Sequence, residues 1–240
     1  MLDRLSKLVP ISLRARLYDE VAQRIRIGDL RQHEATEAAL PHVDLRAEHL
    51  AHLRVVPNRA AMLACLPKAG VVAELGVAAG DFSSDILTVA QPARLHLIDA
   101  WVAEDPRYRH QRTNVERRFA NEINAGRVAI HTGQSIAELA KFAEAYFDWI
   151  YIDTSHDYAT TARELALGRS KVKPGGIIAG HDYVVGNWRN RVRYGVIEAV
   201  HEYCVEYNWE LIFLTHEVHR HLSFAIRAIE ASPRLPPDPK

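Results

Sequence analysis

The chain is 240 residues long and 48% hydrophobic, which is enough to bury one large core or two small ones. Its 30 basic and 30 acidic residues cancel, so no overall field favours a nucleic acid or an anionic membrane as a partner. The two cysteines give neither a disulfide framework nor a zinc pattern, and the sequence has neither a signal peptide nor the roughly 18 apolar residues of a membrane span, so we expect a cytoplasmic protein.

Residues 1–57 are expected to form a helical extension, because they contain no β-rich run. Apolar side chains recur there at helical spacing, at Leu13, Leu17, Val21 and Ile25. Prolines divide the region into helical pieces, at positions 10, 41 and 57. The pattern leaves three roles open for the extension: packing, dimerisation of the protein, or a lid over a substrate.

From Val71 onward, short apolar runs alternate with segments of helical length, as in βαβ units around a parallel sheet. Strands are predicted at 71–75, 94–99, 127–131, 147–153, 175–180, 209–214 and 222–226. Helices are predicted near 81–90, 111–124, 135–145, 158–171 and 190–205. The loop between the last two strands is too short for a crossover helix, so these strands are expected to pair antiparallel.

These elements predict an α/β domain over residues 58–230, with a Rossmann-like, doubly wound sheet. The sheet is expected to have seven strands and to be mostly parallel, with an antiparallel last strand. Residues 231–240 are rich in proline and poor in apolar groups, which predicts a disordered tail.

A glycine-containing segment, VVAELGVAAGDFSSDIL, joins the first of these strands to the first helix. Gly76 allows a sharp turn, and Gly80 allows the start of the helix to pack closely. A dinucleotide-binding loop would read G-x-G-x-x-G, whereas this loop has Ala78 between its two glycines and Glu74 before them. An acid is unfavourable beside a pyrophosphate but suits a cationic amino group. Asp99, at the end of the second strand, can accept hydrogen bonds from both hydroxyls of a ribose. The ligand that joins a ribose to a cationic amino acid without phosphate is S-adenosylmethionine, which is therefore the expected ligand of this segment.

Four stretches, AELGVAAG, LIDAW, HTGQS and FDWIYID, resemble those of the class I S-adenosylmethionine-dependent methyltransferases, over roughly residues 58–229. The resemblance implies that Glu74, Gly76 and Gly80 line the methionine end of the cofactor, that Asp99 binds the ribose, and that Gln134 and Ser135 bind the adenine. Trp101 either stacks on the adenine or packs in the core. The chain departs from the family at Ala78, where a second glycine is common.

Acids and histidines follow two of the predicted strands where those strands end. Asp153 follows the fourth strand, and His181 and Asp182 follow the fifth. Neighbouring strands lie about 4.8 Å apart, so the two carboxylates can converge. Carboxylates that close repel each other unless one is protonated or a cation lies between them. Oxygen ligands favour a hard ion, with magnesium the leading candidate.

The segments DTSHDY and PGGIIAGHDY narrow the resemblance to metal-dependent O-methyltransferases, such as the macrolide-sugar enzymes and, more distantly, catechol O-methyltransferase. This resemblance implies a metal site at Asp153, His181 and Asp182, and a general base at His156. The pair His181–Asp182 stands where the family has two carboxyl or amide side chains. Three alternatives remain open: His156 caps the following helix beside Asp157, His181 is a structural histidine, or Asp153 and Asp182 are surface acids.

The expected function is therefore methyl transfer from S-adenosylmethionine to a hydroxyl group of a small molecule, assisted by Mg²⁺ or another divalent cation. One alternative is an enzyme of the same scaffold with another reaction type, such as a hydroxylase. A second alternative is a protein that binds S-adenosylmethionine or a nucleotide without turnover. We expect no nucleic acid or membrane partner, and a homo-oligomer is possible.

Overall fold

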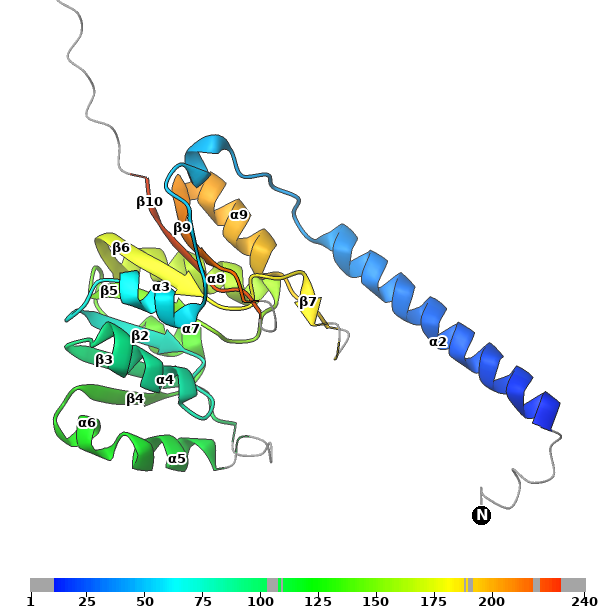
Figure 1. The fold of residues 1–240 in the computed structure, drawn as a ribbon, viewed down its shortest axis with the longest axis horizontal. Coiled ribbons are helices and arrows are strands. Elements are labelled where there is room, and N and C mark those ends of the chain that lie inside the picture. The colour runs from blue at the N-terminus through cyan, green and yellow to red at the C-terminus, as the bar shows by residue number, and fades with distance from the viewer. Residues whose placement is uncertain are drawn as a thin grey trace, which may run out of the picture. The chain divides into compact units, whose positions relative to one another are not determined.

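The computed structural model describes residues 11–102, 108, 110–187, 189, 192–217 and 221–229 (Figure 1). The chain divides into two compact units, Met1–Pro41 and His42–Lys240. In the described part of the chain, the first unit contains the long helix α2 (Ile11–Ala39), and the other described elements belong to the second unit. Within the described residues, no helix has the length and apolar character needed to cross a membrane. The predicted tail, 231–240, lies outside the described residues.

Eight strands of the described residues form one sheet, in the order β1-β9-β10-β6-β5-β2-β3-β4 (Figure 1). Their bounds are β1 (Arg54–Val56), β2 (Val71–Leu75), β3 (Arg94–Asp99), β4 (Val128–Thr132), β5 (Phe147–Ile152), β6 (Val172–Gly180), β9 (Trp209–Thr215) and β10 (Phe224–Ala228). All neighbours pair parallel except β10, which is antiparallel to both β6 and β9. The mostly parallel, Rossmann-like sheet with an antiparallel last strand is confirmed.

The sheet has one strand more than the seven predicted, because β1 lies in the region expected to be helical. β1 pairs parallel with β9, with Arg54 opposite Phe213. The short 3₁₀ helix η2 (Ala47–Leu50) precedes it, and the buried His49 places Nδ1 2.9 Å from the carbonyl oxygen of Trp209. A strand of three residues is too short to show alternation in the sequence, and its pairing with β9 stabilises it.

The helices of the second unit are α3 (Arg59–Cys65), α4 (Asp81–Asp85), the π-helical turn η3 (Ile86–Ala90), α5 (Gln111–Arg118), α6 (Ala120–Asn124), α7 (Ser135–Leu139), α8 (Tyr158–Lys171) and α9 (Val196–Tyr207). A short hairpin of β7 (Gly186–Asn187) and β8 (Val192–Arg193) precedes α9, which therefore starts later than predicted. Helix α7 ends six residues before the predicted 145, and beyond it Phe142 packs its ring 4.8 Å from that of Phe147. Tertiary packing here outweighs the helical preference of the sequence.

The sheet is buried on both faces, as a doubly wound fold requires. Along the central strand β5, Trp149 and Tyr151 enter one core cluster, whereas Ile150 and Ile152 enter the other. Helices α3, α4 and α5 contribute side chains to the first cluster, and α7, α8 and α9 contribute to the second. This alternation leaves the carboxyl ends of the strands as the place where polar side chains emerge.

The turn after β2 approaches the end of β5 very closely. Gly76 has φ +87°, and a Cβ atom there would lie 1.8 Å from the carbonyl oxygen of Asp153. The amide of Gly76 donates to Ile98 at 2.9 Å, and the amide of Asp153 donates to Leu75 at 2.8 Å. These bonds fix the ends of β2, β3 and β5 together, and any side chain at position 76 would separate them.

Substitution of Gly76 tests this contact against a matched control. Gly126 also has a left-handed backbone, with φ +72°, but an added Cβ would meet nothing within 4 Å. We expect Gly126→Ala to lower the free energy of unfolding by about 1–2 kcal/mol, the cost of the left-handed conformation alone. Gly76→Ala should cost more than about 4 kcal/mol or prevent folding. Equal losses for the two variants in urea unfolding would contradict the close approach.

Candidate functional site

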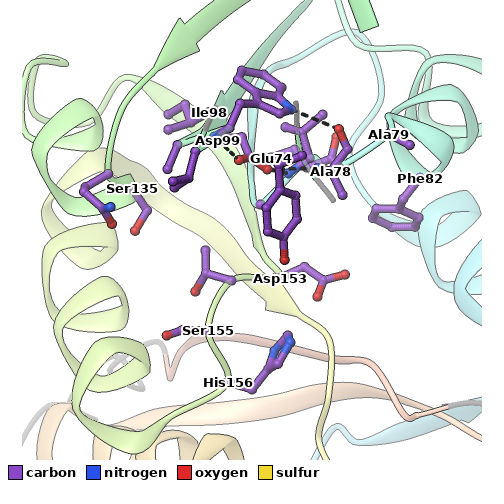
Figure 2. Close-up of a pocket in the computed structure, with 18 of the residues that line it drawn as sticks. Glu74, Ala78, Ala79, Phe82, Ile98, Asp99, Ser135, Asp153, Ser155 and His156 are labelled. Carbon is purple, nitrogen blue, oxygen red and sulfur yellow. Dashed lines mark hydrogen bonds between the residues drawn. The ribbon is translucent and has the colours of Figure 1, made fainter. Parts of the chain in front are cut away.

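A cavity of about 680 Å³ opens at the carboxyl ends of the central strands (Figure 2). It gathers most of the predicted site residues: Glu74, Gly76, Asp99, Trp101, Gln134, Ser135, Asp153 and His156. Gly80, His181 and Asp182 do not line it. Gly80 instead starts α4 with φ +78°, and a Cβ there would press on Phe119 at 2.9 Å. Its role is to let α4 pack against α5 beneath the cavity.

Glu74 on β2 is a buried acid in the cavity wall, with 1% of its surface exposed. It accepts a hydrogen bond of 2.5 Å from the hydroxyl of Ser83. Burial raises the pKa of Glu74 to about 8, against the lowering effect of that bond, and the nearby charges of Asp153 and Asp99 raise it further. A cationic ligand group would favour the ionised carboxylate, so this position suits an ammonium.

Asp99, at the end of β3, holds the glycine-containing loop in place (Figure 2). Its Oδ2 atom accepts from the amides of Val77 and Ala78, both at 2.8 Å, and Oδ1 accepts from the amide of Trp101 at 2.8 Å. A carboxylate has about four lone-pair positions, so roughly one remains for a ligand. The sequence predicts two ribose hydrogen bonds to Asp99, whereas this geometry leaves room for about one.

Trp101 is buried against the same loop, and its indole N–H donates to the carbonyl of Ala78 at 3.0 Å. Ala78 has φ +49°, in the left-handed region where glycine is the favoured residue. The bonds from Asp99 and Trp101 stabilise this strained position. They explain how an alanine can stand where related loops have glycine, and they give Trp101 a structural role in addition to any stacking.

Asp153, His156 and Asp182 converge beside the cavity, with one potential ligand atom from each lying within 4.8 Å of the others. The Nδ1 atom of His156 donates to Oδ2 of Asp182 at 2.8 Å, and His221 binds Oδ1 of the same carboxylate. The sequence motifs predicted the convergence of the two acids. His156 joins the group at the position where His181 was expected.

The charges of this group are strongly coupled. Burial and the negative charge of Asp182 raise the pKa of Asp153 to about 7. Burial would raise the pKa of Asp182, but the hydrogen bond and charge of His156 lower it to about 2. Burial lowers the pKa of His156, yet the hydrogen bond to Asp182 and the negative charges of Asp182 and Asp153 together outweigh burial and leave the pKa above its ordinary value. Near neutral pH, Asp182 therefore carries the negative charge and His156 receives protons readily.

His181 lies in a buried polar chain behind these groups. Its Nδ1 atom is 3.0 Å from the hydroxyl of Ser223, which is 3.0 Å from that of Tyr151. Burial lowers the pKa of His181 to about 4, so the imidazole is neutral at neutral pH. This placement matches the alternative of a structural histidine, and a metal-binding role for His181 stays a prediction.

Two residues of the site were not predicted from the sequence. Arg59, at the start of α3, places Nη1 3.9 Å from Oδ2 of Asp153 and lies 4.7 Å over the ring of Phe82. His221 binds Asp182 from the loop before β10. Neither belongs to a motif at a strand end, and only the histidine-rich stretch around 216–221 gave any signal.

The buried Glu74 predicts a measurable pH dependence of stability. Its pKa in the folded protein, about 8, exceeds the ordinary value of 4.5, so its contribution is complete below about pH 4.5 and is lost as the pH rises through 8. We expect Glu74→Gln to lose less stability than the wild type between pH 5 and pH 8 in urea unfolding. Glu116→Gln, at a partly exposed position on α5, should behave like the wild type. Parallel curves for Glu74→Gln and the wild type would contradict the burial of an ionisable group.

Residues 73–183 match a family model described as a methyltransferase domain. No curated protein shows significant sequence similarity to the chain. An O-methyltransferase family protein from Burkholderia thailandensis superposes with a TM-score of 0.53 at 13% identity, and the match covers 72% of this chain and 56% of that protein, little more than half its length. The m1A22 tRNA methyltransferase of B. subtilis gives a TM-score of 0.51 at 15% identity, over 73% of this chain and 67% of that one.

Fibrillarin from Aeropyrum pernix, solved with natively bound S-adenosylmethionine, gives a TM-score of 0.50 at 14% identity, over 70% of this chain and 73% of that protein. At such identities the likeness establishes the fold, and the family match falls on the segment that forms the cavity apart from Arg59. Residues 73–183 therefore match a methyltransferase domain, and the chain has a Rossmann-like methyltransferase fold.

Proposed function

We propose that this protein transfers the methyl group of S-adenosylmethionine to a hydroxyl group of a small molecule, with His156 as the general base. The observation that carries the proposal is the pair His156–Asp182, in which a cavity-lining imidazole is held by a buried carboxylate at 2.8 Å. Such a pair is the usual arrangement of a base whose orientation is fixed by a third group.

The charge of the cavity favours the cofactor. Its lining carries five carboxyl groups, from Glu74, Asp81, Asp99, Asp153 and Asp157, and among the described residues Arg59 is its one lysine or arginine side chain. A sulfonium and an ammonium are both stabilised by such a surface, whereas a phosphate backbone is repelled. This excess of acidic over basic groups supports a small molecule, rather than a nucleic acid, as the methyl acceptor.

The transfer itself requires alignment and removal of one proton. The methyl carbon forms a bond to the acceptor oxygen while its bond to the sulfonium sulfur breaks, and S-adenosylhomocysteine leaves. Because Nδ1 of His156 donates to Asp182, Nε2 is the nitrogen that can take the hydroxyl proton. Asp182 then stabilises the imidazolium, and its negative charge raises the pKa of His156 for this purpose.

The residues present also fit a divalent cation. Asp153 and Asp182 offer two carboxylates whose oxygens lie within 4.8 Å of each other, which such ions accept, while His156 in the same cluster acts as the base. In the proposed site Asp153 and Asp182 would hold the ion, with His181 as the predicted third ligand. When bound beside the acceptor, such a cation would lower the pKa of the acceptor's hydroxyl group. A cation would also keep Asp153 ionised, against the burial that raises its pKa to about 7.

Replacement of His156 tests its role as the base. His156 has φ +63°, so asparagine is the substitute that best tolerates its backbone. With hydroxyl-bearing acceptors and mass detection of S-adenosylhomocysteine, we expect His156→Asn to reduce transfer by about 100-fold or more. S-adenosylmethionine affinity by calorimetry should stay within about threefold, because losing a base does not remove cofactor contacts. The exposed His110 provides the control His110→Asn.

The same assay with a chelator separates the metal from the base. Loss of transfer in chelator with intact cofactor binding, reversed by Mg²⁺, supports the cation. Full activity in chelator removes the cation from the mechanism and leaves His156 as the base. Wild-type transfer by His156→Asn would contradict the role of His156 in either case.

A further inference from the structure

Glu164 on α8 is a fully buried acid that plays no part in the proposed transfer step. It accepts a hydrogen bond from the hydroxyl of Ser135, at the start of α7, and another of 2.8 Å from the hydroxyl of Thr154, after β5. Ser135 and Thr154 both line the cavity, whereas Glu164 stands behind them. One buried carboxylate thus controls two hydroxyl groups of the cavity wall.

The direction of these hydrogen bonds determines whether the hydroxyls of Ser135 and Thr154 can donate to a ligand or only accept from it. An ionised carboxylate only accepts hydrogen bonds, so Ser135 and Thr154 each give their single hydroxyl hydrogen to Glu164. Burial raises the pKa of Glu164, and these two bonds oppose that rise because they stabilise the carboxylate. The hydroxyl oxygens then have only lone pairs left for the cavity. They can accept from a ligand, but they cannot donate to it.

Ser135, one of these two accepting hydroxyls, lies at one end of the cavity. In Figure 2, Ser135 is on the side opposite Ala79 and Phe82, with Asp99 and Glu74 between. The proposed positions of the ammonium at Glu74 and the ribose at Asp99 leave the nucleobase of the cofactor for the Ser135 end. A base edge placed there must present N–H groups, since a carbonyl oxygen would face the lone pairs of the hydroxyl oxygens.

We propose that Glu164 is a positioning residue that makes the cavity select a 6-aminopurine over a 6-oxopurine. It acts through Ser135 and Thr154, whose hydroxyls it holds as acceptors for the amino group of adenine. This inference rests on the proposed function, because it assumes that the cavity binds S-adenosylmethionine and its product.

Calorimetry with two ligands tests the inference without a methyl acceptor. S-adenosylhomocysteine carries the amino group, and S-inosylhomocysteine carries a carbonyl oxygen in its place. We expect the wild type to bind the adenosyl compound at least about tenfold more tightly, because the inosyl compound leaves polar groups facing one another. Glu164→Gln has one accepting oxygen and one donating NH₂ group, so one of the two hydroxyls must turn its hydrogen toward the cavity. The preference should then fall to about threefold or less.

Two further variants complete the test. Ser135→Ala should also reduce the preference, and it keeps the test valid if Glu164→Gln fails to fold. Ser170→Ala removes an exposed hydroxyl of the same helix α8, one that donates to the carbonyl of Leu167, and should keep the wild-type preference.

Each remaining outcome has a distinct meaning. Equal binding of the two ligands by the wild type would overturn the selectivity and leave the proposed function standing. A full preference retained by Glu164→Gln or by Ser135→Ala would overturn the role of these residues. Binding of neither ligand to folded wild-type protein would overturn the proposed function, and the inference with it.

Discussion

The site depends on a contact in which two glycines let backbones meet at the carboxyl end of β5. A Cβ atom at Gly76, after β2, would lie 1.8 Å from the carbonyl oxygen of Asp153, and one at Gly180, at the end of β6, would lie 2.9 Å from that of Ile152. The residues beside these contacts, Asp153 and Asp182, are therefore forced close together. The two acids lie close together because the backbones approach closely. The repulsion between their negative charges must then be offset by other groups.

The protein accommodates those charges unequally. Asp182 stays ionised because two histidines, His156 and His221, bind its two oxygens. Asp153 and Glu74 are pushed toward their protonated forms, since burial leaves each without a comparable partner. A site arranged in this way gains stability when a positive group enters it. The sulfonium and ammonium of the cofactor, and a divalent cation, are groups of that kind.

The sequence predicted the parts of the fold that local patterns encode. Strands β2 and β3 and helix α8 have the predicted bounds, because continuous apolar runs and the Asp157 cap mark them. Strand β1 was missed because its three residues are stabilised by β9, which lies far along the chain. The predicted α7 was too long because Phe142 packs with Phe147 rather than continuing the helix.

Where a candidate site residue lies at or near the end of a strand, as Glu74, Asp99 and Asp153 do, the sequence predicted its place in the cavity wall. Roles that arise from contacts between distant segments could not be predicted. Glu164 reaches Ser135 across 29 residues, and His221 reaches Asp182 across 39. The three backbone amides that occupy Asp99 depend on the closure of the loop in three dimensions. A sequence pattern can indicate which residue types a reaction needs. Which of their atoms remain available to a ligand depends on hydrogen bonds formed only in the folded protein.

The most direct test of the central claim is the ionisation of His156, measured by ¹⁵N NMR of the histidine rings across pH in the wild type and in Asp182→Asn. We predict a neutral form protonated at Nδ1 and a pKa above 6.5 in the wild type, because Asp182 accepts from that nitrogen. Removing the charge of Asp182 should lower this pKa. The same pKa in both proteins, or a neutral form protonated at Nε2, would contradict the pairing on which the proposed base depends.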